Sequence, residues 1–192
     1  MTDFSQISEI KIGVELTPNP DSLKFVVNRP LLDAGSIFFS DANSAQGSRL
    51  PASLFEVESV AEILIGTDFI TITKKKGPPW EPLIPPLFER MKSVLNASGD
   101  QPLLSDEARI KSEASGSDPT ERRIREVLDS EIRPAVARDG GDIVFQSYSA
   151  GVVKLHLQGA CSTCPSSLMT LRLGVEARLK ALIPEIREVI HA

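Results

Sequence analysis

Two cysteines, Cys161 and Cys164, are the side chains of this 192-residue chain best suited to chemistry, and the chain has no others. Two residues separate them in the sequence GACSTCPSS at residues 159–167, so both sulfurs are able to face one centre. A metal ligand and a redox nucleophile both require the thiolate form of cysteine. A disulfide closing so small a loop would remove little unfolded-state entropy. The spacing therefore predicts metal or redox chemistry at this pair.

The residue that follows the pair favours thiolates at this position. Pro165 suits the first turn of a helix, so Cys164 is expected near the helix N-cap. The positive end of the helix dipole and the unpaired N–H groups there stabilise a thiolate. The alternative without chemistry, a pair of small buried hydrophobic side chains, ranks below metal binding for this reason.

Counting ligands limits what the pair is able to bind. Iron–sulfur clusters usually take four cysteine ligands, and a structural zinc ion takes four ligands in a tetrahedron. One chain supplies two cysteines, and its only histidines, His156 and His191, do not stand at a zinc-finger spacing. A complete four-sulfur site therefore needs two chains, most simply a symmetric dimer. A zinc site shared across such a dimer remains open.

A thioredoxin-like thiol–disulfide oxidoreductase is the competing function for the pair. A strand followed by a helix, which that function requires, is expected around the cysteines. Against it, no aromatic residue precedes Cys161 directly, and the strand order of thioredoxin is absent.

The elements that must position the cysteines fall into two parts. Residues 98–117 are rich in Ser, Gly, Asp and Ala, which predicts a flexible linker between a domain at 1–97 and a domain at 118–192. The predicted fold class is α+β, with two small α/β domains. In the first domain we expect strands at 11–16 and 23–27, a helix at 52–57, strands at 60–65 and 69–73, and a helix from about Pro82 or Pro86 to Asn96. Lys74–Lys76 is expected to be a solvated strand end.

The second domain is predicted to have the order α-β-β-α-β. Asp118, with Pro119 after it, is a helix N-cap signature, and Pro134 is expected to kink or end that helix. The sequence DGGD at 139–142 predicts a turn with positive φ at either glycine and with carboxylates that cap or face solvent. Strands at 143–148 and 152–158, a helix at 165–183 and a strand at 185–191 are expected to follow.

Composition excludes several classes of function. The chain has 21 basic and 26 acidic residues, a net charge of −5, which argues against nucleic acid as a partner. No apolar run approaches the roughly 20 residues of a membrane-spanning helix, so no membrane partner is expected. Residues 1–11 lack a basic segment followed by an apolar stretch, so secretion is not expected. The expected location is the bacterial cytoplasm, or the mitochondrial matrix if a presequence has been removed.

Six sequence segments resemble known iron–sulfur biogenesis proteins. IRPAVARDGGD at 132–142, GACSTCPSS at 159–167 and TLRLGVE at 170–176 resemble the NifU C-terminal (Nfu) domain. TPNPDSLKF at 17–25, LFEVE at 54–58 and GTDFITIT at 66–73 resemble the Nfu N-terminal domain. One departure is Ser59-Val60, where the family pattern has Gly-Val.

The resemblance implies a scaffold or carrier rather than an enzyme. It implies that Cys161 and Cys164 of two protomers hold a 4Fe–4S cluster between them. The partners it implies are apo iron–sulfur client proteins, upstream assembly factors and a second copy of the chain. The first domain has no cysteine or histidine. We therefore expect it to dock clients or to steer the cluster-bearing domain.

Overall fold

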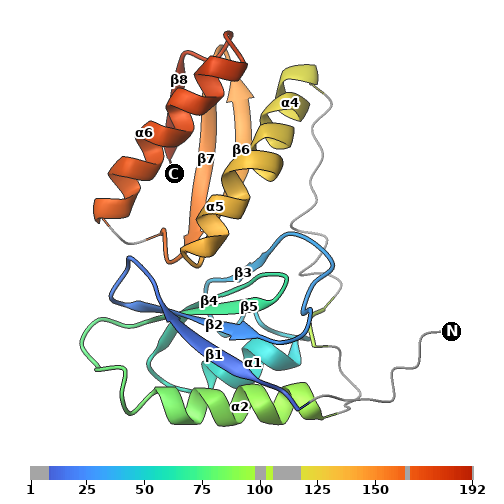
Figure 1. Ribbon diagram of the computed structural model, residues 1–192, viewed down its shortest axis with the longest axis vertical. Helices are drawn as coiled ribbons and strands as arrows, with labels where there is room; N and C mark the ends of the chain where they lie inside the picture. Colours follow the sequence, from blue (N-terminus) through green and yellow to red (C-terminus); the bar gives the residue numbers. More distant parts are fainter. Residues whose placement is uncertain (1–8, 98–102, 106–117, 163–164, 192) are drawn as a thin grey trace, which may run out of the picture.

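The computed structural model describes residues 9–97, 103–105, 118–162 and 165–191, and for 165–172 it describes the backbone alone. Two α/β units, each with its own sheet and apolar core, make up these residues (Figure 1). The first unit is residues 9–97 with 103–105, and the second unit is residues 118–162 with 165–191. The α+β fold class is confirmed.

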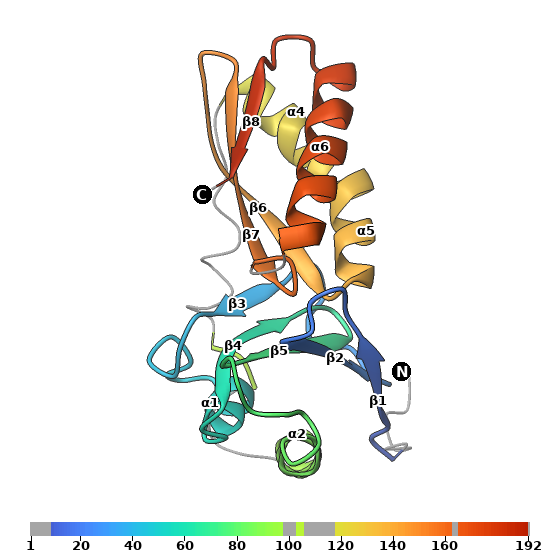
Figure 2. The same cartoon turned by 90° about the vertical axis from the view of Figure 1, so that its left-hand side faces the viewer.

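The first unit is a five-stranded antiparallel sheet in the order β1-β2-β5-β4-β3. Helices α1 and α2 lie on the face of the sheet that is turned away from the second unit (Figure 2). Alternate residues of β2, β4 and β5 point to these helices, as the two-residue period of a strand requires. The elements are β1 (Ile12–Leu16), β2 (Ser22–Val27), β3 (Ile37–Phe39), α1 (Arg49–Phe55), β4 (Val60–Ile65), β5 (Phe69–Lys74) and α2 (Ile84–Asn96).

Four of these strands and α2 match the sequence prediction, while β3 was not predicted. Three residues are too few for an alternating pattern to be recognised. Helix α1 begins at Arg49, earlier than predicted, because Leu50 and Pro51 are buried in its first turn. Leu104 is buried in the same core, and Leu103 O accepts a hydrogen bond of 3.2 Å from Leu50 N. The rest of the predicted linker lies outside the described residues and stays a prediction.

The second unit has the predicted order α-β-β-α-β. Strands β6 and β7 are antiparallel, and β8 pairs with β7 in parallel. Helix α6 makes the crossover that a parallel pair needs. The helices lie together on one face of this sheet (Figure 2). The elements are α4 (Pro119–Val127), the π-helical turn η1 (Leu128–Ile132), α5 (Arg133–Arg138), β6 (Gly141–Ser149), β7 (Val152–Gly159), α6 (Pro165–Leu182) and β8 (Glu188–His191).

The predicted start of the first helix in this unit is confirmed. The Asp118 side chain accepts hydrogen bonds from Thr120 N at 2.6 Å and Glu121 N at 3.4 Å. The helical path does not end at Pro134. It passes through η1 and continues as α5, because Pro134 occupies the first turn of α5, where its missing N–H has no required acceptor. None of the described helices is long and apolar enough to cross a membrane.

Candidate functional site

Cys161 is the second residue after β7, which ends at Gly159; we call residues 159–162 the cysteine loop. Its side chain is 5% exposed and packs in the core of the second unit. A Cβ placed on Gly141 would lie only 2.4 Å from the Cys161 Sγ. The sulfur is therefore turned toward the first residue of β6. Cys164 lies outside the described residues, and α6 begins at Pro165, as predicted from the helix-start pattern.

The backbone around this sulfur is shaped by glycines. Gly140 has a φ of 75° and Gly159 a φ of 64°, a left-handed conformation that favours glycine. Gly141 pairs with Gly159 across β6 and β7, and Ala160 N donates a hydrogen bond of 3.1 Å to Gly140 O. The prediction of a positive φ in the DGGD turn is confirmed at Gly140, and the turn is tied directly to the cysteine loop.

The predicted role of the two carboxylates in that turn is right for one and wrong for the other. Asp139 is exposed, but Asp142 is buried. The Asp142 carboxylate accepts hydrogen bonds from Ser36 Oγ of the first unit and from Ile143 N, and it lies 3.4 Å from Arg133 Nε. These partners satisfy the carboxylate, which would otherwise be costly to bury. Contact with the first unit is therefore why Asp142 does not face solvent.

The first unit also contacts the cysteine loop itself. Asn19 Nδ2 donates a hydrogen bond of 3.2 Å to Ala160 O. The Ser162 hydroxyl lies 3.1 Å from Glu62 Oε2 and 2.8 Å from Gly159 O, so its single proton is shared between two acceptors. The cysteine loop thus lies between the core of its own unit and the sheet of the first unit (Figure 1).

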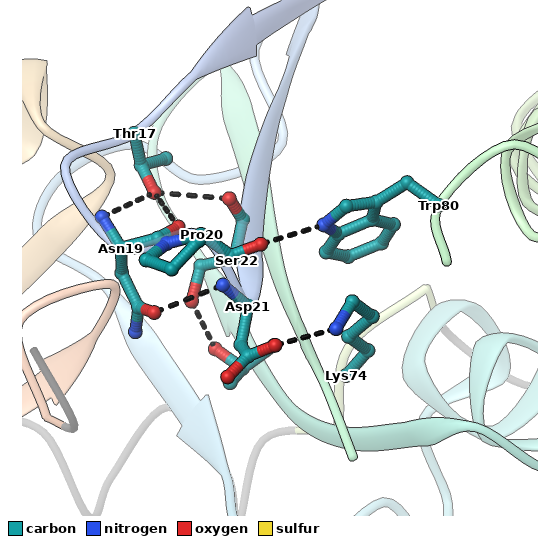
Figure 3. Close-up of polar contacts among 8 residues, drawn as sticks. Thr17, Asn19, Pro20, Asp21, Ser22, Lys74 and Trp80 are labelled. Carbon is teal, nitrogen blue, oxygen red and sulfur yellow. Dashed lines mark hydrogen bonds and ion pairs between the residues drawn. The ribbon is translucent and has the colours of Figure 1, made fainter. Parts of the chain in front are cut away.

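The turn between β1 and β2 holds the Asn19 side chain in place (Figure 3). The Asn19 Oδ1 accepts a hydrogen bond of 3.0 Å from Asp21 N, which leaves the Nδ2 for Ala160. Thr17 Oγ1 lies 2.9 Å from the carbonyl oxygens of both Asn19 and Ser22 and closes the turn. The sequence predicted a turn here but not its contact with the cysteine loop.

Two residues outside the turn brace it (Figure 3). Lys74 Nζ pairs with Asp21 Oδ1, and Trp80 Nε1 donates a hydrogen bond of 2.9 Å to Pro20 O. Lys74 is 8% exposed, so the prediction of a solvated strand end is wrong for this residue, although Lys75 and Lys76 are exposed. The charge of Lys74 is buried because Asp21 is there to pair with it.

Other ligand types do not gather near the cysteine loop. Among the described residues, no three or more His, Cys, Asp or Glu side chains group as a metal site would require. His156 lies on β7 three residues before its end, roughly 10 Å away along a strand. His191 pairs with Leu155 at the far edge of the sheet. The carboxylates near the loop, Glu62 and Asp142, are hydrogen-bonded to protein groups, so the described part of the site offers Cys161 as its ligand.

Comparison with known proteins identifies the family. A model described as "NifU-like domain" matches residues 124–190, and one described as "Scaffold protein Nfu/NifU N terminal" matches residues 12–98. The chain belongs to the Nfu/NifU-like family. The resemblance predicted from the sequence is thus confirmed. The second unit corresponds to the NifU-like domain and the first unit to the Nfu N-terminal domain.

Curated members of the Nfu family match nearly the whole chain. A Drosophila erecta protein named "NFU1 iron-sulfur cluster scaffold homolog, mitochondrial" is 43% identical over 180 residues, which are 93% of this chain and 63% of that protein. A Drosophila grimshawi protein of the same name is 45% identical over 182 residues, 93% of this chain and 60% of that protein. The chain therefore spans about three fifths of the length of these relatives.

One solved structure with a related title resembles part of this chain. The solution structure of a NifU-like protein from Saccharomyces cerevisiae is 23% identical, covers 55% of this chain and 92% of its own, and gives a TM-score of 0.44.

Proposed function

We propose that this chain holds an iron–sulfur cluster of the 4Fe–4S type between two protomers and delivers it to apo-proteins. Cys161 and Cys164 of each protomer are the proposed ligands. The cluster is cargo, which arrives from upstream assembly factors and leaves with the client. The proposal does not make the chain an enzyme, because no substrate bond is made or broken in a catalytic cycle.

The observation that carries the proposal is the position of the cysteine pair. It lies between β7 and α6 inside the NifU-like domain, and it contains both cysteines of the chain. Neither histidine lies at the cysteine loop. A cluster with four cysteine ligands then requires two loops, one from each protomer.

Transfer follows from the small number of ligands per chain. Each protomer contributes two thiolates, so a client that offers more cysteines, or better-placed ones, is able to replace them one after another. The sulfur of Cys161 faces the core of its own unit, so the loop has to turn outward before it binds. The loop is turned outward both when the chain receives the cluster and when it passes the cluster to a client.

Anaerobic reconstitution with iron and sulfide tests the proposal. We expect a dimer by gel filtration with about four irons and four sulfides per two chains. Cys161→Ser and Cys164→Ser should each abolish stable loading. The matched control is His156→Gln, which changes a potential ligand of the same domain that lies away from the loop and should leave loading unchanged.

Other outcomes identify other functions. A colourless monomer that retains no iron would refute the proposal. Stoichiometric disulfide turnover by that species would then support a thiol–disulfide oxidoreductase. Retention of zinc by a dimer, with no iron loaded, would replace the cluster by a shared zinc ion.

The relatives also bear on location. The Drosophila proteins carry the word "mitochondrial" in their names, and the bacterial cytoplasm, our first expectation, has no support among them. We therefore propose the mitochondrial matrix, the second of the two expected locations.

A further inference from the structure

One side of the first sheet faces the second unit rather than α1 and α2. Lys24, Thr71 and Leu64 form a cross-strand row on this side, because Lys24 pairs with Thr71 and Thr71 with Leu64. Leu64 is fully buried but does not belong to the core beneath the sheet. Glu62 lies two residues before Leu64 and so shares its side. We call these four residues the loop-facing row.

The loop-facing row fits glycines of the second unit. A Cβ on Gly159 would lie 2.6 Å from Leu64 Cδ2, and one on Gly140 would lie 2.9 Å from Thr71 Oγ1. Beside these contacts, Lys24 Nζ donates a hydrogen bond of 3.2 Å to Arg138 O. The row therefore approaches the backbone of both the DGGD turn and the cysteine loop.

The contact between the loop-facing row and the second unit has features of an interface whose two sides separate reversibly. Most of its members are polar, as in interfaces between parts of a chain that move. The Thr71 Oγ1 is buried and has no hydrogen-bond partner among the described residues. Water would satisfy this hydroxyl if the units separated, and leaving it unsatisfied costs free energy in the closed form. A cleft of about 1040 Å³ lies beside the contact and is lined by residues of both units, among them Ser36 and Phe39 from the first and Arg125 and Arg133 from the second.

We infer that the first unit is a reversible cap that clamps the cysteine loop with Cys161 turned inward. Asn19 and Glu62 hold the residues on either side of Cys161, and Leu64 covers Gly159. The inference rests on the proposed function in one respect: a cluster shared by two chains requires the loop to turn outward. Capping and cluster sharing are therefore mutually exclusive states of the same loop.

The cap has a quantitative consequence. If only a fraction of the chains is uncapped, the apparent dissociation constant for the cargo rises by the reciprocal of that fraction. Weakening the cap should therefore expose Cys161 in the apo-protein and strengthen loading, although no ligand has been changed.

Alkylation of Cys161 in the apo-protein tests the cap without any cluster. The background is Cys164→Ser, so that Cys161 is the only thiol. Leu64→Lys removes an apolar contact of the cap and should raise the alkylation rate by on the order of tenfold. The matched control is Leu16→Lys, the same change at a position on the same sheet that is 89% exposed, which should leave the rate unchanged.

A second variant keeps the test decisive if Leu64→Lys unfolds the first unit. Glu62→Ala removes, from a half-buried strand position, the one acceptor of the Ser162 hydroxyl that belongs to the first unit, while Gly159 O remains. It should raise the rate severalfold, with the fluorescence of Trp80 unchanged. Unchanged alkylation in both folded variants would overturn the cap, because Cys161 would then be covered by its own unit alone. In the two-cysteine protein, Leu64→Lys should also load cluster at lower iron and sulfide. Failure of every chain, wild type included, to load iron would refute the proposed function and leave the alkylation result standing.

Discussion

Gly141→Ala tests whether the sulfur of Cys161 is packed as the structure describes. The substitution adds one methyl group at the start of β6. Its Cβ would lie 2.4 Å from the Cys161 Sγ, 3.1 Å from the Cys161 Cβ and 3.2 Å from Gln158 O. The first distance is shorter than any ordinary contact, since nonbonded heavy atoms rest about 3.5–4.0 Å apart. The sulfur or the strand must therefore move by about 1 Å.

The expected change in the free energy of unfolding is the penalty for overpacking minus the gain from replacing a glycine. Overpacking a well-packed site costs about 1–3 kcal/mol. Gly141 does not have a positive φ, so alanine is compatible with the backbone there, and removal of a glycine from a strand returns about 0.5–1 kcal/mol. We expect the second unit to lose roughly 1 kcal/mol of its free energy of unfolding.

Urea unfolding of the reduced apo-protein measures this loss. Far-UV circular dichroism follows both units, whereas the fluorescence of Trp80, the only tryptophan, follows the first unit. The transition of the second unit should shift and that of Trp80 should not. The control is Gly174→Ala in α6, where, apart from the backbone of the helix itself and the adjoining residues, no atom of the described residues lies within 4 Å of the added Cβ. That change should stabilise by about 0.5–1 kcal/mol.

A double-mutant cycle with Cys161→Ala decides the cause. With the sulfur removed, the penalty of Gly141→Ala should fall by about 1 kcal/mol, because the shortest contact has gone. An equal penalty in both backgrounds would refute the packing of Cys161 against Gly141, and with it the inward orientation of the sulfur.

Three further predictions concern single contacts. Asp118→Ala removes the cap of α4 and should cost about 1 kcal/mol in urea unfolding, whereas a change below 0.3 kcal/mol would contradict the capping role. A hydrogen bond from Arg178 lowers the pKa of Glu131 below its ordinary value of 4.5. The pair therefore stabilises the folded state fully above pH 4.5, and this stabilisation is lost as the pH falls through the lowered pKa. Glu131→Gln should therefore lower the Tm at neutral pH but not in strong acid, and a difference that persists in acid would contradict the pair. Gly66→Ala should destabilise the first unit by about 1–3 kcal/mol in urea unfolding followed by Trp80 fluorescence, because the added Cβ would lie 2.2 Å from the Phe69 ring. Adding Phe69→Leu to the same chain removes the ring and should restore part of the lost free energy of unfolding; no restoration would contradict the clash.

Local sequence patterns predicted the parts of the fold that local interactions determine. The alternation in β7 and the N-cap at Asp118 are each set within a few residues, and both were predicted correctly. The cysteine pair was predicted as a site from spacing and from the helix start after it. The domain boundaries at 97 and 118 and the role of Cys164 stay predictions.

Contacts between the two units could not be predicted in this way. Asn19 and Ala160 are 141 residues apart, and no periodicity records such a contact. The burial of Asp142 has the same origin, since Ser36 comes from the other unit. One indication was present: β4 ends in the uninterrupted apolar run ILI, at positions 63–65, which is typical of a strand buried on both faces. It indicated that something covers Leu64.

The hydrogen bond between Asn19 and Ala160 also bears on how the chain is made. The strands and helices of the first unit precede residue 97 and its last described residue is Ser105, so that unit is complete in the growing chain before the cysteines are added. The interval is about 60 residues, several seconds at 5–20 residues per second, and domains fold as units during synthesis. The surface that receives the cysteine loop is therefore in place when the thiols first emerge. Synthesis in this order means that the Cys161 sulfur, which is buried in the finished fold, meets a surface of the first unit that is already formed.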